Sequence, residues 1–297
     1  MNAEQGGILA IEPECYRDWV ARAIGYDADV VARAQSQPLT ALAPGRKSVG
    51  DIAVIRLGGF ITQKPSLMTM LFGGTSTEAL VGEVRSAMAE PSIGAVILAV
   101  DSPGGGVFGV PEAAEALRGL RGGKPFIAVS DPLNASAAYY LSSQADEVVA
   151  TPSSLTGSIG VMSIYADESK ALEKAGISVE AITFGRRKAE ASGLKPLTEE
   201  ARAGIQDRVD YYGGLFVSDV AKARKVSPSN VRSRFGEGSV FTAGQALSSG
   251  MVDRIATMEE VIGGLATGRK TQMRMEGDPV EIAARAVLAG LSGQGVE

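Results

Sequence analysis

The sequence predicts an α/β fold with a mainly parallel sheet flanked by helices. Short apolar runs alternate along the chain with segments of helical periodicity, which is the order of elements in α/β proteins. The runs are apolar throughout, as expected for parallel strands that are buried on both faces. With 297 residues and 45% hydrophobic content, the chain can bury the core of one large domain or two modest ones.

The predicted strands and helices follow one another from residue 52 onward. Strands are expected at 52–59, 95–100, 126–130, 147–151, 160–166 and 181–185. Helices are expected at 75–90, 111–121, 136–145, 167–175 and 198–224. The first helix opens with a capping box from Thr75 to Glu78. A short strand, a helix and a last strand are expected after the long helix.

The chain divides into an arm, a compact region and a tail. Residues 1–48 are predicted to be an N-terminal arm and linker. Its first part, residues 1–35, is expected to be helical with mixed charge, and the stretch that follows is rich in Pro, Ser and Gly. Residues 49–268 form the predicted domain, and residues 269–297 form a tail that is helical or disordered.

Composition and charge exclude several classes of partner. The net charge is -5 and the Lys and Arg residues are scattered, so no basic surface for nucleic acid is expected. No run of about 18 uncharged apolar residues occurs, which predicts no membrane span. Glu4, Glu12 and Glu14 stand where a signal peptide would have basic and apolar residues. The chain is therefore expected to be cytoplasmic.

Histidine is absent from the chain, and Cys15 is its single cysteine. These two facts exclude Ser-His-Asp and Cys-His catalysis and argue against a zinc site. No metal or cofactor is expected. A nucleophile in this chain needs another base, and lysine is the usual substitute where burial or nearby positive charge lowers its pKa.

Chemistry gathers at the carboxyl ends of parallel strands, and three predicted strand ends stand out. Gly104 and Gly105 follow the second strand and can offer backbone amides to a ligand, with a plain tight turn as the alternative. Ser136 follows the third strand at a helix start, where a serine is ordinarily a cap. Lys188 follows the sixth strand in a basic run, for which a solvated turn is the alternative.

Four motifs, taken in order, resemble those of the signal peptide peptidase A (SppA)/phage protein C family of Ser-Lys serine peptidases. They are SPGG at 102–105, ASAAYY at 135–140, ATPSSLTGSIGV at 150–161 and GRRKAEASG at 185–193. The resemblance spans about residues 50–260. It implies a ClpP/crotonase-like fold, a spiral of β-β-α units with a mainly parallel sheet flanked by helices.

The resemblance implies a role for each residue that matches a family motif. Ser136 matches the nucleophile, and Lys188 matches the general base of a Ser-Lys dyad. Ser158 matches a serine that orients the base. The implied oxyanion hole consists of Gly104, Gly105 and Ala137.

Two departures from the family pattern concern the neighbours of these residues. Ala137 and Ala138 replace a Gly-Gly pair, and such small residues still permit a helix start with a free amide. Ala189 and Glu190 replace a Ser-Ala pair, which puts a carboxylate near the implied base.

The family includes membrane-anchored enzymes that degrade signal peptides and soluble enzymes of tailed phages and prophages that digest scaffold protein. The absence of a span and the segment ILAIEPECYRDWVARA favour the phage branch. The resemblance therefore implies a capsid maturation endopeptidase that cleaves scaffold protein through an acyl-enzyme, in the host cytoplasm or the procapsid. A homo-oligomer whose subunit contacts help shape the active site is expected.

Several alternatives stay open. The first is a signal-peptide-degrading peptidase of the SppA type. The others are a catalytically inactive structural capsid component and a crotonase-like acyl-CoA enzyme. SGLK at 192–195 also fits the Ser-x-x-Lys motif of penicillin-recognising enzymes, but neither a Ser-Asp-Asn nor a Lys-Thr-Gly partner is present.

Overall fold

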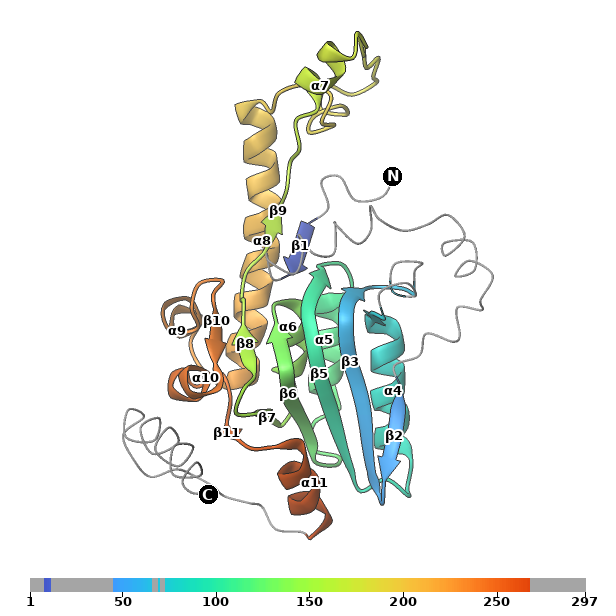
Figure 1. Ribbon diagram of the computed structural model, residues 1–297, viewed down its shortest axis with the longest axis vertical. Coiled ribbons are helices and arrows are strands. Elements are labelled where there is room, and N and C mark those ends of the chain that lie inside the picture. Colours follow the sequence, from blue (N-terminus) through green and yellow to red (C-terminus); the bar gives the residue numbers. More distant parts are fainter. Residues whose placement is uncertain (1–7, 12–44, 66–68, 70–72, 268–297) are drawn as a thin grey trace, which may run out of the picture.

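The computed structural model describes residues 8–11, 45–65, 69 and 73–267, and Figure 1 labels their strands and helices. The strands are β1 (Ile8–Ile11), β2 (Arg46–Val49), β3 (Ile52–Thr62), β4 (Thr75–Ser76), β5 (Ala95–Gly106), β6 (Phe126–Ala135), β7 (Glu147–Ala150), β8 (Leu155–Gly157), β9 (Met162–Ser163), β10 (Val240–Thr242) and β11 (Arg254–Ile255). The helices are α4 (Thr77–Ala89), α5 (Val110–Gly119), α6 (Ala137–Ser142), α7 (Ser169–Lys174), α8 (Glu199–Arg224), α9 (Pro228–Arg234), α10 (Ala243–Ser249) and α11 (Met258–Ala266).

The strands form one mixed sheet whose centre is parallel. β5 pairs in parallel with β3 on one edge and with β6 on the other. β6 in turn pairs in parallel with β7 and, further along, with β8. Antiparallel pairs lie at the margins, where β2 joins β3, β10 joins β8 and β1 joins β5. The predicted α/β class with a mainly parallel sheet is confirmed.

Helices cover the two faces of the sheet unequally. α4, α5 and α6 lie together behind the sheet in Figure 1, and α8 rises beside them. Their apolar side chains pack with the strands into the larger core, in which Leu80, Val84 and Leu117 are completely buried. On the other face, Val261 of α11 belongs to a smaller cluster with Ile97 of β5. The central strands therefore have helices on both faces only where α11 packs.

The helix predicted at 75–90 has a different cap from the one expected. Thr75 belongs to β4, and its hydroxyl accepts a hydrogen bond from the Gly58 amide (3.0 Å) and donates one to the Gly58 carbonyl (2.8 Å). Ser76 is the N-cap instead, and its side chain accepts from the Ala79 amide (3.2 Å). The predicted capping box from Thr75 to Glu78 is therefore wrong, because the contact with β3 takes the threonine hydroxyl.

Three predictions of local structure are also wrong. Residues 181–185 form no strand and lie in an exposed stretch between α7 and α8. The strand predicted at 160–166 is reduced to Met162–Ser163. Residues 8–11, expected within a helical arm, form a strand. The common reason is that strand formation depends on a pairing partner, which the local sequence does not specify.

Parts of the predicted arm and tail lie outside the described residues. These parts include residues 12–44, with Cys15 and two of the three acidic residues near the start, and residues 268–297. The predicted domain limits therefore stay a prediction. Within the described ranges, no helix is both long enough and apolar enough to cross a bilayer.

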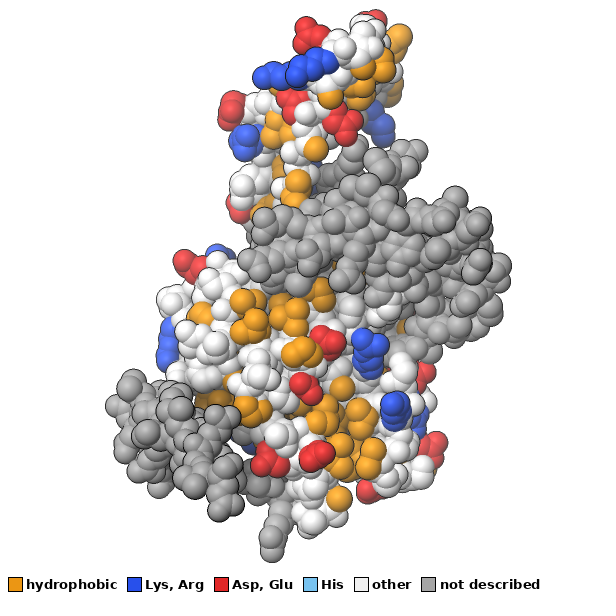
Figure 2. Space-filling model, in the orientation of Figure 1, with side chains coloured by type: hydrophobic (Ala, Val, Ile, Leu, Met, Phe, Trp, Pro, Cys, Tyr) orange, Lys and Arg blue, Asp and Glu red, His pale blue; other side chains and the backbone are white. Residues whose placement is uncertain are grey.

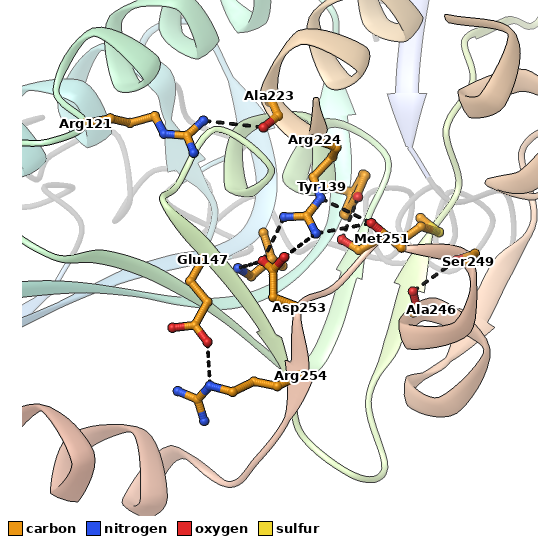
Figure 3. Close-up of polar contacts among 12 residues, drawn as sticks. Arg121, Tyr139, Glu147, Ala223, Arg224, Ala246, Ser249, Met251, Asp253 and Arg254 are labelled. Atoms are coloured by element: carbon orange, nitrogen blue, oxygen red, sulfur yellow. Dashed lines mark hydrogen bonds and ion pairs between the residues drawn. The ribbon is translucent and has the colours of Figure 1, made fainter. Parts of the chain in front are cut away.

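A polar cluster at the base of α8 ties α6 to the C-terminal part of the chain (Figure 3). The Tyr139 hydroxyl donates to the Met251 carbonyl (2.8 Å), and Arg224 forms an ion pair with Asp253 (2.7 Å). Asp253 also accepts a hydrogen bond from the Val148 amide in β7 (2.8 Å). Burial raises the pKa of Tyr139 above its usual range, so the hydroxyl stays neutral and remains a donor. These contacts fix α6, α8 and β7 relative to one another.

Tyr139→Phe is expected to lower the free energy of unfolding by about 1–3 kcal/mol, because the buried Met251 carbonyl loses this donor. Tyr211→Phe alters a tyrosine that is 63% exposed, and it should change the same quantity by less than about 0.5 kcal/mol. Urea denaturation of the parent and both variants measures the difference. Equal unfolding midpoints for Tyr139→Phe and the parent would contradict the role of this hydrogen bond.

Candidate active site

Ser136 lies at the sharp turn that leads from β6 into α6. Its backbone has φ 55° and ψ -121°, a conformation that costs a non-glycine residue on the order of 1–3 kcal/mol. The Ser136 amide donates to the Gly157 carbonyl (2.7 Å), and the Ser136 carbonyl accepts from the Tyr140 amide (2.9 Å). The turn therefore holds a strained serine at the carboxyl end of a parallel strand, where functional residues gather in α/β proteins.

The Ser136 side chain makes none of the contacts that a structural serine would make. Although Ser136 stands at the N-cap of α6, its hydroxyl makes no capping hydrogen bond. The residue is 1% exposed, and within the described part of the chain its Oγ is a buried polar atom without a hydrogen-bond partner. Buried hydroxyls are almost always hydrogen-bonded. The capping role is therefore ruled out, and the hydroxyl is available for another role.

A buried polar network beneath the turn fixes its shape, and it was not predicted from the sequence. Asn134 is fully buried, and its Nδ2 donates to Ser130 Oγ (2.9 Å) and Ser142 Oγ (2.8 Å). Thr156 Oγ1 of β8 also donates to Ser130 Oγ (3.2 Å). The network joins β6, α6 and β8 around Ser136. Its signal in the sequence is the pair of polar residues, Ser130 and Asn134, in a strand that starts as an apolar run.

The predicted oxyanion glycines lie at the end of β5, beside the end of β6. Gly104 has φ 102°, and its amide donates to Ser102 Oγ (3.2 Å). A Cβ atom on Gly105 would come within 2.1 Å of the Ile61 carbonyl oxygen in β3, so a side chain does not fit there. Gly105 lies in the strand ladder with Ile61 of β3, so Gly104, Gly105 and Ala137 all stay candidates for oxyanion donors.

Ser158 occupies the equivalent position at the end of the neighbouring strand. β8 pairs in parallel with β6, and Gly157 lies opposite Ala135. Ser158 and Ser136 are the next residues of the two strands, and both have φ 55°. The Ser158 amide donates to the Ser239 carbonyl (2.8 Å). The structure thus brings together three predicted parts of the site, namely the serine at 136, the serine at 158 and the glycine segment.

Lys188 lies away from this group, on a projecting segment (residues 164–198) that carries α7. The segment extends beyond the sheet at the N-terminal end of α8 (Figure 1). Lys188 is exposed there, and Arg186, two residues before it, pairs with Glu200 in the first turn of α8 (2.7 Å). The carboxylate of Glu190, two residues after Lys188, pairs with Arg187 (2.8 Å).

The length of α8 separates Lys188 from Ser136 within one chain. Phe216 of α8 stacks on Tyr140 of α6, with ring centroids 4.4 Å apart. The Tyr140 amide donates a hydrogen bond to the Ser136 carbonyl, so this stacking lies one helical turn from Ser136. A rise of about 1.5 Å per residue places Glu200 about 24 Å from Phe216 along the helix axis. In the described arrangement, Lys188 and Ser136 of the same chain therefore cannot form a hydrogen bond.

A cavity of about 600 Å³ opens next to Ser158. It lies between the residues that follow Ser158 and the helices α8 and α9, and its lining includes Ile159, Asp210 and Val217. The cavity has room for a side chain of a bound polypeptide. Across the residues that the structure describes, no three Asp, Glu, Cys or His side chains gather as potential metal ligands.

A family model described as "Peptidase family S49" matches residues 118–272 of the chain. The matched range contains Ser136, Ser158 and Lys188. It begins after the glycine segment of β5. The candidate oxyanion role of that segment is therefore supported by the SPGG motif and the local geometry, and not by the family match.

Two curated relatives match most of this chain over less than half of their own length. Capsid assembly protease C of Escherichia phage lambda is 27% identical over 214 residues, which are 72% of this chain and 48% of that protein. Protease 4 of Salmonella typhi is 29% identical over 214 residues, which are 72% of this chain and 34% of that protein. Among solved structures, the ClpP protease catalytic domain from Plasmodium falciparum has a TM-score of 0.43 at 10% identity, over 69% of this chain and 86% of that chain. That likeness concerns the fold alone.

Ser136→Ala is expected to leave the free energy of unfolding unchanged or to raise it by up to about 1 kcal/mol, because it removes a buried hydroxyl that lacks a partner. The matched control is Ser143→Ala, which alters the buried serine at the other end of α6. The Ser143 hydroxyl donates to the Tyr140 carbonyl (2.8 Å) and accepts from Gln144 Nε2 (3.0 Å), so its removal should lower the free energy by about 1–3 kcal/mol. Urea denaturation gives both values. A loss at Ser136→Ala as large as that at Ser143→Ala would contradict the absence of a partner.

Proposed function

The chain belongs to peptidase family S49, and from that premise we propose that it is a serine endopeptidase with Ser136 as nucleophile and Lys188 as general base. The observation that carries the proposal is the buried Ser136 hydroxyl, held without a partner on a strained turn. The glycine segment of β5 and Ser158 lie beside it, and they supply other groups that an acyl transfer needs.

The proposed reaction proceeds through an acyl-enzyme. A neutral Lys188 Nζ takes the Ser136 hydroxyl proton while Oγ attacks the carbonyl carbon of a peptide bond. The amides of the glycine segment and of Ala137 donate to the oxyanion, and Ser158 orients the lysine. The C–N bond then breaks, and the leaving amine takes the proton from Lys188. Lys188 then takes a proton from water as its oxygen attacks the ester carbonyl carbon. When the ester C–O bond breaks, Lys188 passes that proton to Ser136 Oγ, which restores the serine.

We propose further that Lys188 acts on Ser136 of a second copy of the chain. Within one chain the two residues stand too far apart, because the projecting segment lies at the far end of α8. The segment also exposes apolar side chains, visible in orange at the top of Figure 2, and contact with a partner would remove them from water. The large exposed ones are Ile164, Ile177, Val179, Ile182 and Phe184. A homo-oligomer in which each segment reaches a neighbouring site accounts for both features.

For the substrate, we propose a scaffold protein of a phage or prophage that is cleaved during capsid maturation. The support is the similarity to a protein named Capsid assembly protease C. Degradation of signal peptides and an inactive structural role in the capsid are the alternatives. Serine peptidases attack extended chain, so exposed stretches of scaffold should be cleaved while folded capsid subunits survive.

Ser136→Ala and Lys188→Ala are each expected to lower kcat/KM for a fluorogenic peptide by at least about 100-fold, because both groups act in one proton transfer. Lys195→Ala removes another lysine of the projecting segment and should keep the activity of the parent. Initial rates on the full chain measure the effect. A smaller loss at either residue of the dyad, or an equal loss at Lys195→Ala, would contradict the assignment.

Mixing the two inactive variants tests which copy supplies the lysine. A hybrid oligomer contains sites with an intact Ser136 from one subunit and an intact Lys188 from its neighbour. The mixture is therefore expected to regain activity that neither variant has alone. A mixture that stays inactive although native mass spectrometry detects mixed oligomers would contradict the shared site, as would a fully active monomer in light scattering.

Co-expression with the scaffold and capsid proteins of a phage or prophage that encodes this chain tests the proposed substrate. The scaffold band is expected to disappear with the wild-type chain and to persist with Ser136→Ala, because only the former can form the acyl-enzyme. The capsid band should persist in both. Intact scaffold beside an enzyme that cleaves the fluorogenic peptide would exclude the scaffold role. Recovery of the enzyme with membranes, together with loss of signal peptides, would favour the alternative.

A further inference from the structure

β1 fills a slot in the sheet between two segments that flank the candidate active site. On one side, residues 9–11 pair antiparallel with residues 104–106 at the end of β5. On the other side, Ile8 and Leu9 pair antiparallel with Met162–Ser163 of β9. Figure 1 shows β1 near the upper end of β5. A short strand from the N-terminal part of the chain therefore lies between the glycine segment and the segment that follows Ser158.

The slot exists because β6 leaves the edge of β5. The two strands pair as far as Ser102 and Asn134, after which β6 turns at Ser136 into α6. Residues 104–106 therefore present backbone groups that β6 does not reach, and strand edges of this kind readily add an extended chain. One side of the slot, residues 104–106, contains the candidate oxyanion glycines. The other side, β9, follows Ser158 by four residues.

β1 runs toward the candidate oxyanion hole. Ala10 lies opposite Gly105, whose amide is a candidate donor. The next residue, Ile11, lies opposite Gly104, one step nearer to the end of β6. A polypeptide whose carbonyl group is attacked by Ser136 has to lay its main chain along this same edge. Recognition there uses main-chain hydrogen bonds and therefore depends little on the side chains of the added strand.

Access to Ser136 is closed in the described arrangement. The residue is 1% exposed, whereas a substrate must bring a carbonyl carbon into contact with its Oγ. Entry of a polypeptide therefore requires another group to leave. β1 is short, with residues 8–11 alone in the strand, and it lies along the edge that the substrate needs.

We propose that β1 is an internal competitor of the substrate. Residues 8–11 occupy the strand site, between residues 104–106 and Met162–Ser163, that an unfolded polypeptide segment takes when it binds. The meaning of this competition rests on the proposed peptidase function, but the competition itself is a binding equilibrium that needs no catalysis. Occupancy by β1 lowers the apparent affinity for substrate in proportion to the fraction of molecules whose slot is free.

The test weakens β1 in the full chain and measures peptide binding. Leu9 faces strand neighbours on both sides, and Leu9→Pro removes its amide donor. Leu9→Ile is the matched control, because it keeps the amide and the side-chain volume. Both are made in Ser136→Ala, and the probe is a fluorescein-labelled peptide with the sequence of residues 6–13, GGILAIEP. Fluorescence anisotropy should give a dissociation constant at least about tenfold lower for Leu9→Pro than for Leu9→Ile, which corresponds to about 1.4 kcal/mol.

Hydrogen exchange at residues 104–106 gives a second readout. Leu9→Pro should exchange faster there than Leu9→Ile, and saturating peptide should restore the protection. Equal affinities in the two variants, no binding to either, or exchange that is unchanged by Leu9→Pro would each overturn the proposal. Ala10→Pro, with Ala10→Ser as its control, repeats the comparison if Leu9→Pro fails to fold.

The outcome separates this inference from the peptidase function. Competition in the Ser136→Ala background, with no cleavage by the wild-type chain, would support the strand site and contradict the peptidase function. Cleavage by the wild-type chain, with a KM that is the same in Leu9→Pro and Leu9→Ile, would support the peptidase function and overturn the competition.

Discussion

The hydrogen bond from the Ser136 amide to the Gly157 carbonyl joins the ends of the two strands on which the candidate site depends. It ties the turn after β6 to the turn after β8, so the positions of Ser136 and Ser158 are set together. A residue with φ 55° needs support from its surroundings. The buried side chain of Asn134 and the first turn of α6 provide that support, which explains why so many polar groups are buried around one short helix.

The fold class could be predicted from local signals in the sequence, whereas the residues of the candidate site were indicated by motifs that resemble those of a family. Apolar runs of strand length indicate buried strands. The ends of parallel strands indicate which residues lie at the same edge of the sheet. The motif residues Ser136 and Ser158 were predicted separately along the chain, and the register of β6 and β8 places them side by side, with the glycine segment following β5 at the same edge. Parallel pairing, which the continuous apolar runs had indicated, brings the carboxyl ends of these strands to one edge of the sheet.

The parts that could not be predicted depend on partners that are distant in sequence. Thr75 has the right spacing for a capping box, but β3 takes its hydroxyl. Residues 181–185 have the composition of a strand and find no strand to pair with, whereas residues 8–11 find two. Asn134 interacts with Ser142 only because the turn at Ser136 folds α6 back over β6. A local pattern shows polar residues within an apolar strand, but it does not show which partners they meet.

α8 has a mechanical consequence for the proposed dyad. The helix runs from Glu199 to Arg224, a length of about 39 Å. The helix is anchored in its second half, where Phe216 stacks on Tyr140 and Arg224 pairs with Asp253, and its N-terminal end carries the segment with Lys188. Over the roughly 24 Å from Phe216 to Glu200, a tilt of about 5° moves the N-terminal end by about 2 Å, and a misplacement of about 1 Å can slow a reaction about 100-fold. Sequence changes around the anchor can therefore tune the turnover rate over a wide range without altering any group that touches the substrate.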